Sequence, residues 1–363
     1  MSSSIPAQYT GYAAIDEEHG KKFDLRPWSY TPMEFSEDLI DIKIECCGIC
    51  GSDAHTVTNG WPSPTPYPAI VGHEIIGTVV RAGSKSGHEI GSRVGVGAQA
   101  FCCDNCDFCK KGLESQCRDG MKGTYATPVP RGPGGADAIT QGGYADFTRV
   151  QGKLAVKLPE SLDSTAAAPL MCAGVTVYAP LKRFGCGPGK KVGIIGIGGL
   201  GHLALQVASA MGAEVYALSH SDSKLQDAQK LGVKPENFII TKDVKAVAKK
   251  YNKHFDILLN TSSGSSMPLE SLYFPLLNNL GALVLCGLPE DKLPPFYVHQ
   301  LVGKSLTLAG SLIGGTTEIK ELFELAAKHD IKAWVTARPM KEASAAIRDM
   351  EEGKARYRFV LQN

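Results

Sequence analysis

The second half of the chain alternates short apolar runs with amphipathic stretches, and this alternation most constrains the fold. From residue 190 the apolar runs KKVGIIG, AEVYALS, FDILLN and GALVLCG are separated by helical stretches such as HLALQVASAM and SKLQDAQKLG. Short apolar strands joined by helices are typical of a parallel sheet with helices on both of its faces. We therefore expect a doubly wound α/β domain in this region.

The rest of the chain is β-rich. DLIDIKIECCGICGSD, IIGTVVRAGS and GGYADFTRVQGKLAVKLP resemble short strands broken by turn residues. The stretch TNGWPSPTPYPAIVGHE contains four prolines, which exclude a helix and predict a rigid surface excursion. After the alternation fades, a helix (EIKELFELAAKH) and a final strand (ARYRFVLQN) follow. We expect a β-rich domain over residues 1–162 and 306–363, and the α/β domain over 163–305.

A glycine-rich turn, GIGGLG, joins the strand VGII to the helix HLALQVASAM. Gly196, Gly198 and Gly201 have the spacing in which one glycine makes a tight turn, one admits a pyrophosphate and one allows close helix–strand packing. The helix that follows directs its first amide groups at the same place. The pattern indicates a dinucleotide site; the alternative is a turn that binds nothing.

The end of the second strand bears on which dinucleotide binds. NAD-selective sites place Asp or Glu about 20 residues after the fingerprint, where it binds the ribose 2′-hydroxyl. This strand ends in Ser219, followed by His220, Ser221 and then Lys224. Hydroxyls and a cation suit a 2′-phosphate, so the sequence predicts NADP. Asp222 lies beyond the usual position of the acid, and an NAD preference with a merely polar turn remains the alternative.

Four cysteines stand close together in CDNCDFCKKGLESQC, residues 103–117. Cys103, Cys106, Cys109 and Cys117 can enclose one Zn²⁺ tetrahedrally, and a site filled by four thiolates is structural. An iron–sulfur cluster and a redox dithiol are the rival interpretations. Cys102 adjoins the run, but only a set that begins at Cys103 has the regular spacing. A nucleic-acid zinc ribbon would need a surrounding basic excess, which this segment lacks.

A second metal site would need dispersed ligands. Cys50 in CGICGSDAH, His73 in VGHEIIG and Cys172 in LMCAGVTVY make up a Cys₂His set, and Glu74 follows His73. Such a set leaves one tetrahedral position open for water or substrate, as Lewis-acid catalysis requires. Spacing alone does not bring these residues together, and Cys172 by itself is better explained by core packing than by metal binding.

Charge and composition exclude several classes of function. The chain has 38 basic and 37 acidic residues, so no overall charge favours nucleic acid or an acidic membrane. The sequence contains no 18-residue apolar run, so no transmembrane helix is predicted. The first residues lack the pattern of a signal peptide. We expect a cytoplasmic protein without nucleic-acid or membrane partners. In that reducing compartment, the 11 cysteines are explained by metal binding or burial.

Five motifs together resemble one known family. CGICGSDAH, GHEIIGTVVRAGS, the four-cysteine segment, LMCAGVTVY and GIGGLGH occur in the order found in the medium-chain zinc alcohol dehydrogenases. The residues within these motifs are similar to those of the cinnamyl alcohol dehydrogenase subfamily, including its fungal NADP-dependent members. The resemblance extends from about residue 35 to YRFVL near the end. It implies a GroES-like β-rich catalytic domain and a Rossmann cofactor domain.

The resemblance also implies roles for individual residues. A catalytic zinc would be bound by Cys50, His73 and Cys172, with Glu74 as an alternate ligand, and a structural zinc by Cys103, Cys106, Cys109 and Cys117. Ser52 would receive the substrate proton and His55 would pass it toward solvent. The cofactor would contact Thr176, the loop Gly196, Gly198, Gly199, Leu200 and Gly201, then Ser219, His220, Ser221, Lys224 and Arg358. Leu288 and the GSLIGG run would line the nicotinamide.

The implied activity is hydride transfer between NADP(H) and aromatic, cinnamyl-type or medium aliphatic aldehydes and alcohols, with two Zn²⁺ per subunit of a homodimer. Because cells keep NADP reduced, aldehyde reduction is the expected direction. Two departures from the family are visible: Ser92 replaces an acid, and NGWPSPTPYP is unusually long, which makes Trp61 a candidate wall of the substrate entrance. The alternatives are an NAD-dependent polyol dehydrogenase and a non-catalytic NADPH-binding protein.

Overall fold

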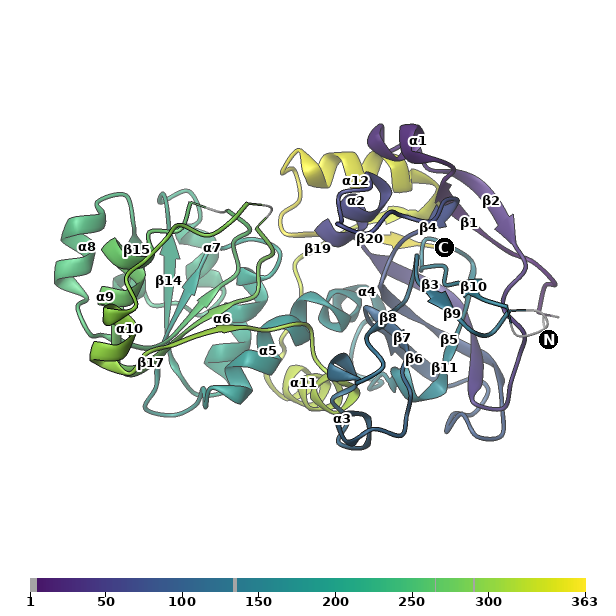
Figure 1. Ribbon diagram of the computed structural model, residues 1–363, viewed down its shortest axis with the longest axis horizontal. Helices are drawn as coiled ribbons and strands as arrows, with labels where there is room; N and C mark the ends of the chain where they lie inside the picture. Colours follow the sequence, from purple (N-terminus) through teal and green to yellow (C-terminus); the bar gives the residue numbers. More distant parts are fainter. Residues whose placement is uncertain (1–4, 133–135, 265, 290) are drawn as a thin grey trace. The chain divides into compact units, whose positions relative to one another are not determined.

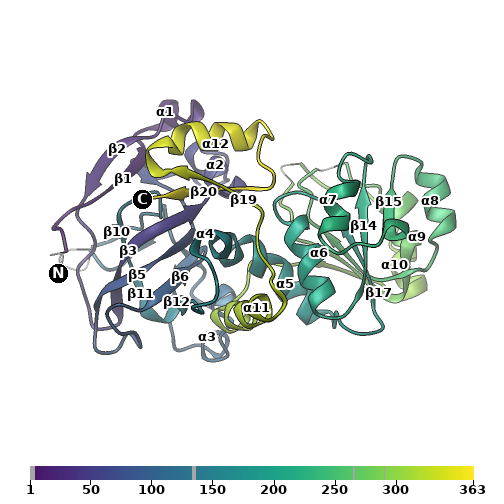
Figure 2. The ribbon, with the colours of Figure 1, turned by 180° about the vertical axis from the view of Figure 1, so that it is seen from behind.

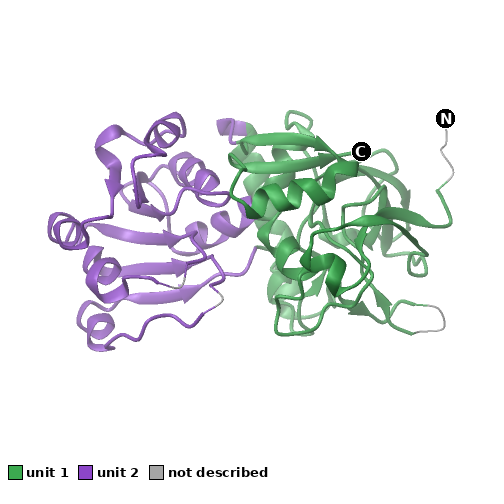
Figure 3. Cartoon of the chain, turned by 90° about the horizontal axis from the view of Figure 1, so that it is seen from above, with its two compact units in different colours: residues 1–172, 314–327, 332–363 green, residues 173–313, 328–331 purple. Residues whose placement is uncertain are grey.

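The computed structural model describes residues 5–132, 136–264, 266–289 and 291–363 (Figure 1; the reverse side is in Figure 2). These residues form two compact units (Figure 3). Unit 1 comprises residues 1–172, 314–327 and 332–363, and unit 2 comprises residues 173–313 and 328–331. The chain passes from unit 1 into unit 2 and returns to unit 1 twice.

Unit 1 is built around a seven-stranded sheet with the order β12-β6-β5-β3-β20-β19, and β11 also pairs with β3. Smaller sheets have the orders β2-β1-β4, β10-β9 and β7-β8. The strands of this unit are β1 (Tyr9–Ala14), β2 (Arg26–Tyr30), β3 (Leu39–Gly48), β4 (Ala69–Ile70), β5 (Glu74–Ala82), β6 (Arg93–Val96), β7 (Gln99–Phe101), β8 (Lys122–Gly123), β9 (Pro128–Val129), β10 (Ala138–Ile139), β11 (Phe147–Gln151), β12 (Ala155–Lys157), β19 (Val335–Pro339) and β20 (Arg358–Gln362).

The helices of unit 1 range in length from 4 to 14 residues. They are α1 (Glu17–Lys21), α2 (Gly51–Val57), α3 (Asp107–Lys110), α4 (Ser164–Ala167), α11 (Thr316–His329, whose last residues fall in unit 2) and α12 (Ala343–Glu351). The apolar face of the sheet forms one core in which β3 is central, because Leu39, Ile40, Ile42 and Ile44 are all at most 2% exposed. This core fixes the strand ends that carry the candidate ligands.

Unit 2 is a parallel six-stranded sheet with the order β15-β14-β13-β16-β17-β18, which is the doubly wound order of dinucleotide-binding folds. Its strands are β13 (Lys191–Ile195), β14 (Glu214–Ser219), β15 (Phe238–Ile240), β16 (Phe255–Asn260), β17 (Leu277–Leu285) and β18 (Thr307–Gly310). Its helices are α5 (Ala173–Arg183), α6 (Gly201–Ala210), α7 (Leu225–Lys230), α8 (Val244–Lys250), α9 (Phe274–Leu276) and α10 (His299–Lys304). The predicted mixed architecture of a β-rich and a Rossmann-type unit is confirmed.

The borders of the compact units differ from the expected domain limits. We expected the α/β domain over 163–305, whereas unit 2 runs from 173 to 313. At the far end, β18 pairs in parallel with β17, so the strand–helix alternation extends through Gly310. At the near end, α4 contacts β3 and β5 of unit 1. The domain limits themselves stay a prediction.

Two local expectations also differ from the structure. CGICGSD was expected to continue a strand, but α2 begins at Gly51 because Asp53 hydrogen-bonds the backbone of Cys50 and caps the helix. Within the described residues, no single helix is long and apolar enough to cross a membrane; one bent pair, Ser164–Met171 with Ala173–Arg183, passes that test by length and composition only.

Candidate functional site

Four dispersed side chains of unit 1 converge on one point. The ligand atoms of Cys50, His73, Glu74 and Cys172 all lie within 4.8 Å of one another, and all four residues are buried. The pairing of two strands explains most of this convergence. Gly48, the last residue of β3, lies opposite Glu74, the first residue of β5. Residues just beyond the end of β3 and just before the start of β5 must therefore be neighbours.

Cys172 reaches the cluster from a break between helical segments. It follows a 3₁₀ turn over Ala168–Met171 and precedes α5, with backbone angles φ −125° and ψ −72° that are not helical. Its Sγ lies 3.1 Å from Nε2 of His73. The break therefore turns its thiol toward the cluster, so core packing alone does not describe Cys172.

Asp53 is a functional residue that the sequence interpretation missed. Its Oδ1 lies 3.0 Å from Nδ1 of His73, and its Oδ2 accepts hydrogen bonds from the Cys50 amide (2.9 Å) and the Tyr144 hydroxyl (2.8 Å). A carboxylate on the far nitrogen of a ligating imidazole fixes the ring's tautomer and orientation. The available signal was an acid three residues after Cys50, the capping-box position of α2.

Glu74 and Arg358 form a buried ion pair beside the thiols. A guanidinium nitrogen of Arg358, the first residue of β20, contacts Oε1 of Glu74, whose side chain is fully buried. Within the described part of the chain, the other oxygen, Oε2, has no hydrogen-bond partner. Arg358 was expected at the cofactor; the structure instead places it against the candidate alternate ligand, because β20 pairs with β3 at Val360 and Gly48.

The electrostatics of the cluster suit a cation. The hydrogen bond between the two thiols lowers the pKa of Cys50 well below its usual value and raises that of Cys172. Burial acts to lower the pKa of His73, but the charges of Asp53 and Cys50 outweigh it and raise that pKa. Burial also raises the pKa of Glu74 to about 7, against the pull of Arg358. Two thiols, one imidazole and a carboxylate oxygen without a partner match the ligands that zinc prefers.

Ser52 and His55, the expected proton relay, both lie half-buried on α2. Ser52 Oγ is 3.9 Å from Cys50 Sγ, next to the cluster. The ring of His55 contacts that of Trp61, with centroids 5.0 Å apart. The indole nitrogen of Trp61 donates to Thr56 Oγ1 (2.9 Å), which fastens the proline-rich segment to α2.

The four closely spaced cysteines form a second cluster in unit 1. The sulfur atoms of Cys103, Cys106, Cys109 and Cys117 lie within 4.8 Å of one another. Cys102 belongs to no such group among the described residues, and its amide instead donates to Gln151 Oε1 at 3.0 Å. Hydrogen bonds from the backbone amides of Arg118 and Cys109 lower the pKa of Cys106 to about 6, which favours a thiolate. All 11 cysteines are free thiols, in agreement with a metal rather than disulfides.

The segment that carries these cysteines is fastened to the start of α11. The carboxylate of Glu114, which is fully buried, accepts from the amide (2.9 Å) and hydroxyl (3.0 Å) of Thr316. A Cβ added to Gly315 would lie 1.9 Å from the carbonyl oxygen of Gly112, so the two backbones touch. The cysteine segment therefore binds the start of α11, which begins 202 residues after Glu114 in the sequence.

The glycine loop of unit 2 has the shape that its spacing predicts. Gly196 has φ +87°, and a Cβ on Gly201 would lie 2.0 Å from the carbonyl oxygen of Gly196. Nothing lies within 4 Å of a Cβ built on Gly198, so its backbone can be approached from outside. Gly199 and Leu200 complete the loop, and the side chain of Leu200 does not cap α6. The first amide groups of α6 are therefore not satisfied by a capping side chain.

The residues after β14 partly match their expected positions. Ser219 is the last residue of β14, and both it and Lys224 are half-buried, whereas His220 and Ser221 are exposed. The Lys224 ammonium donates to the carbonyl oxygen of Ile197, so it lies against the glycine loop.

For three further predicted cofactor contacts, the described residues show a position in the fold but no contact that identifies a cofactor role. Thr176 is buried in α5, where its carbonyl oxygen accepts from Cys286 Sγ at 3.5 Å. Leu288 is 58% exposed, and the GSLIGG run directly follows Ala309 of β18. His202, which was not predicted, is fully buried, and its Nδ1 lies 3.1 Å from the carbonyl oxygen of Gly198.

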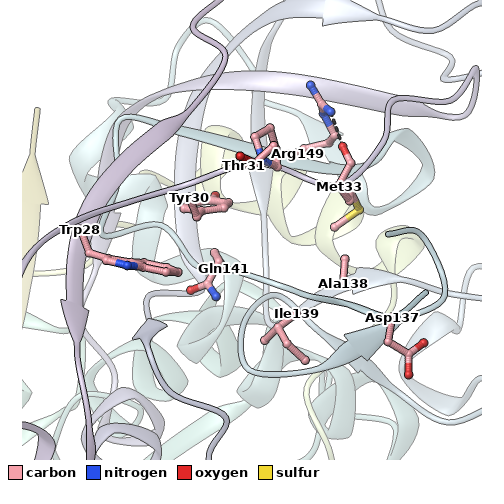
Figure 4. A pocket seen from close by; sticks show the side chains of 10 residues that line it. Trp28, Tyr30, Thr31, Met33, Asp137, Ala138, Ile139, Gln141 and Arg149 are labelled. Carbon is pink, nitrogen blue, oxygen red and sulfur yellow. Dashed lines mark hydrogen bonds between the residues drawn. The ribbon is translucent and has the colours of Figure 1, made fainter. Parts of the chain in front are cut away.

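A pocket of about 330 Å³ in unit 1 is lined by other residues (Figure 4). Trp28 and Tyr30 stack along one side, with ring centroids 5.7 Å apart. Two polar side chains of this pocket bind neighbouring groups: Arg149 binds Asp41 and the carbonyl oxygen of Met33, and Gln141 binds the amide of Ile70. The pocket therefore offers mainly aromatic and apolar surface, and none of its lining residues belongs to either cysteine-containing cluster.

Family models match both units. The model described as alcohol dehydrogenase GroES-like domain matches residues 36–160, and the model described as zinc-binding dehydrogenase matches residues 199–328. The chain is also 39% identical over 367 residues to NADP-dependent alcohol dehydrogenase 6 of Saccharomyces cerevisiae, covering 99% of this chain and 97% of that protein.

Two solved structures have closely similar folds. A cinnamyl alcohol dehydrogenase from Sorghum bicolor has a TM-score of 0.87 and 31% identity, with 98% of this chain and 97% of that chain covered. A structure titled CAD from Helicobacter pylori, complexed with NADP(H), has a TM-score of 0.85 and 30% identity, with 99% of each chain covered.

Proposed function

Because this chain belongs to the zinc-binding alcohol dehydrogenase family, we propose that it is an NADP-dependent alcohol dehydrogenase and aldehyde reductase. Its substrates would be aromatic, cinnamyl-type or medium aliphatic aldehydes and the corresponding alcohols. The observation that carries the proposal is the convergence of Cys50, His73, Glu74 and Cys172 in one buried cluster of a chain that also has a dinucleotide-binding sheet. We propose further that the β-rich domain binds the metals and the α/β domain binds the cofactor.

Two zinc ions per subunit would have different tasks. The buried mixed set of Cys50, His73 and Cys172, with Glu74 as alternate ligand, would bind the catalytic ion, and the four-cysteine set the structural ion. When bound, the catalytic zinc supplies Lewis-acid polarisation of the substrate oxygen and NADP(H) supplies the hydride acceptor or donor. Ser52, next to Cys50, would exchange the proton with the substrate oxygen, and His55 would carry it toward solvent.

The NADP preference follows from what β14 lacks. Its last residue is Ser219, where a carboxylate would repel a 2′-phosphate. Ser219 and Ser221 offer hydroxyls, His220 an imidazole and Lys224 an ammonium group instead. Lys224 would have to exchange the carbonyl oxygen of Ile197 for the phosphate. Gly196, Gly198, Gly199, Leu200 and Gly201 would hold the pyrophosphate, and Thr176 would contact the cofactor elsewhere.

The test is a comparison of kcat/KM for cinnamaldehyde reduction with NADPH and with NADH, for the natural chain and for Ser219→Asp. We expect the natural chain to prefer NADPH and the variant to move that ratio toward NADH by on the order of tenfold or more, because the new carboxylate repels the 2′-phosphate and binds the ribose. Ser223→Asp is the matched control, since it adds the same charge beyond the strand end.

Two other functions would give different results. A natural preference for NADH would support an NAD-dependent polyol dehydrogenase, and oxidation of sugar alcohols should then be measured. Two bound zincs without turnover of any aldehyde would support a non-catalytic NADPH-binding protein. The complete set of Cys50, Ser52, His55, His73, Glu74 and Cys172 favours an enzyme over that second alternative.

We propose also that the protein is a cytoplasmic homodimer, and that Trp61 forms a wall of the substrate entrance. The dimer is supported by the edge strand β18 of unit 2 and by nearby apolar side chains: Tyr297 is 72%, Val298 62% and Val302 71% exposed. An unpaired strand edge with apolar neighbours is a surface that a second copy can cover. Sedimentation equilibrium checks the dimer, and charged substitutions at Val302 should weaken it.

A further inference from the structure

We propose that Tyr125 is a positioning residue that holds the imidazole of His73 in the orientation required of a metal ligand. This inference rests on the catalytic metal site proposed above and adds a residue to it. Tyr125 follows β8 and so comes directly after the four-cysteine segment in the chain. It touches no candidate thiol ligand by hydrogen bond among the described residues, but it reaches His73.

The geometry places Tyr125 and Asp53 at the same nitrogen. The Tyr125 hydroxyl lies 3.0 Å from Nδ1 of His73, the same distance as Oδ1 of Asp53. The two rings are tilted by 51° with centroids 5.5 Å apart, so the phenol also packs against the imidazole. A ring with two hydrogen-bond partners at Nδ1 has less freedom to swing than a ring with one.

Asp53 by itself has many donors to satisfy. Its two oxygens also accept from the amides of Cys50 and Gly72 and from the Tyr144 hydroxyl. A neutral imidazole carries one N–H hydrogen, on either Nδ1 or Nε2. That hydrogen must be on Nδ1 if Nε2 is to bind a metal beside Cys172. The Tyr125 side chain also hydrogen-bonds Asp53, so its hydroxyl can donate to that carboxylate and accept from Nδ1–H, which favours the tautomer that leaves Nε2 free.

Tyr125 also connects the ligand to the proline-rich segment. The hydroxyl of Thr56 interacts with that of Tyr125, accepts from the indole of Trp61, and donates to the carbonyl oxygen of Ser52 at 2.9 Å. Thr56 is 4% exposed, so this contact is shielded from water. The orientation of His73 is thus supported from α2, from the proline-rich segment and from the turn after β8 at once.

The experiment uses the full-length holoprotein with Tyr125→Phe, which removes only the hydroxyl. The matched control is Tyr67→Phe, because the Tyr67 hydroxyl donates to the carbonyl oxygen of Val57 (2.8 Å), away from the ligands. Zinc is titrated out with a chromogenic chelator, and a sample with Co²⁺ at the catalytic site and Zn²⁺ in the four-cysteine site gives the visible absorption of the catalytic metal. Removing an outer partner of a ligating histidine typically costs 10–100-fold in metal affinity.

We expect Tyr125→Phe to bind the catalytic metal about tenfold more weakly and to shift the Co²⁺ absorption, whereas Tyr67→Phe matches the natural chain. Unchanged affinity and an unchanged spectrum in Tyr125→Phe would overturn the inference. Should that variant not fold, Thr56→Val removes the hydroxyl neighbour of Tyr125 and must weaken the same metal; an unchanged affinity there also overturns it.

The same titration separates this inference from the proposed function. If the natural chain binds metal only in the four-cysteine cluster, the proposed catalytic site itself fails. If the natural chain binds two metals and reduces aldehydes, but Tyr125→Phe behaves as the natural chain does, only the role of Tyr125 fails.

Discussion

The two metal-type clusters of unit 1 are the same size, yet their members are spaced very differently in the sequence. One takes all its sulfur atoms from Cys103 to Cys117, within a single excursion of the chain. The other takes Cys50, His73, Glu74 and Cys172 from strand ends and a helix break. The first can form when a short loop closes on itself. The second exists only if β3 and β5 are paired in the correct register.

The clusters also differ in what surrounds them. Cys103 and Cys106 are only half-buried, and the cluster has thiols alone. The dispersed cluster is buried throughout, mixes three kinds of donor and has Asp53, Tyr125 and Arg358 directly behind its ligands. A closed set of identical ligands suits a structural clamp, whereas mixed ligands with orienting partners suit a site where a substrate must bind.

The largest effect should follow from Cys50→Ser. We expect kcat for aldehyde reduction to fall on the order of 10³-fold or more, because a serine hydroxyl is a poor zinc ligand and Lewis-acid polarisation is lost. Thermal stability should change little. Steady-state kinetics and a melting curve measure both effects. Cys46→Ser, near the end of β3 and outside the cluster, should keep its activity. If Cys50→Ser kept a tenth of the activity, Cys50 would not be an essential ligand and the contrast between the two clusters would be wrong.

Cys103→Ser should have the opposite signature. Losing one of four ligands releases a metal whose binding energy contributes to folding, so we expect the melting temperature to fall by roughly 10 °C. The protein that stays folded should keep its kcat per catalytic zinc. Differential scanning calorimetry with zinc analysis provides the measurement. Cys102→Ser is the control, since Cys102 is buried beside the cluster but is not a member. A stable, inactive Cys103→Ser would reverse the two assignments.

The smallest effect should come from Asp38→Asn, which touches neither cluster and calibrates the stability measurements. A hydrogen bond from Arg131 lowers the pKa of Asp38 to about 2. Because the folded pKa lies below the unfolded value of about 3.9, this pair stabilises the fold above that pH and loses its contribution as pH falls toward 2. We expect a difference of less than about 1 kcal/mol at pH 6. Urea unfolding across pH 3–6 should show it shrinking with acidity; a difference that grows would contradict the sign.

Much of the fold was predictable because its signals are local. Apolar runs of strand length with helices between them predicted the parallel sheet, and the order of that sheet agrees with a dinucleotide-binding fold. The expectation failed where one capping contact ended a strand: the extended run through CGICGSD stops at α2 because of Asp53. The expected α/β region also ended before β18, because the pairing of β18 with β17 depends on a contact that no local pattern encodes.

For the candidate sites, the distance between partners along the chain decided what could be seen. The sequence by itself determined the four-cysteine set and the glycine loop, since each lies within one short segment whose spacing limits its geometry. Only the tertiary structure decided that Asp53 and Tyr125 share Nδ1 of His73 and that Arg358 lies against Glu74. The contact of Arg358 with Glu74 and the approach of His73 to α2 depend on the antiparallel pairing of β3 with β5 and β20, whereas Tyr125 arrives from beyond β8; register is a property of the assembled sheet rather than of any one strand.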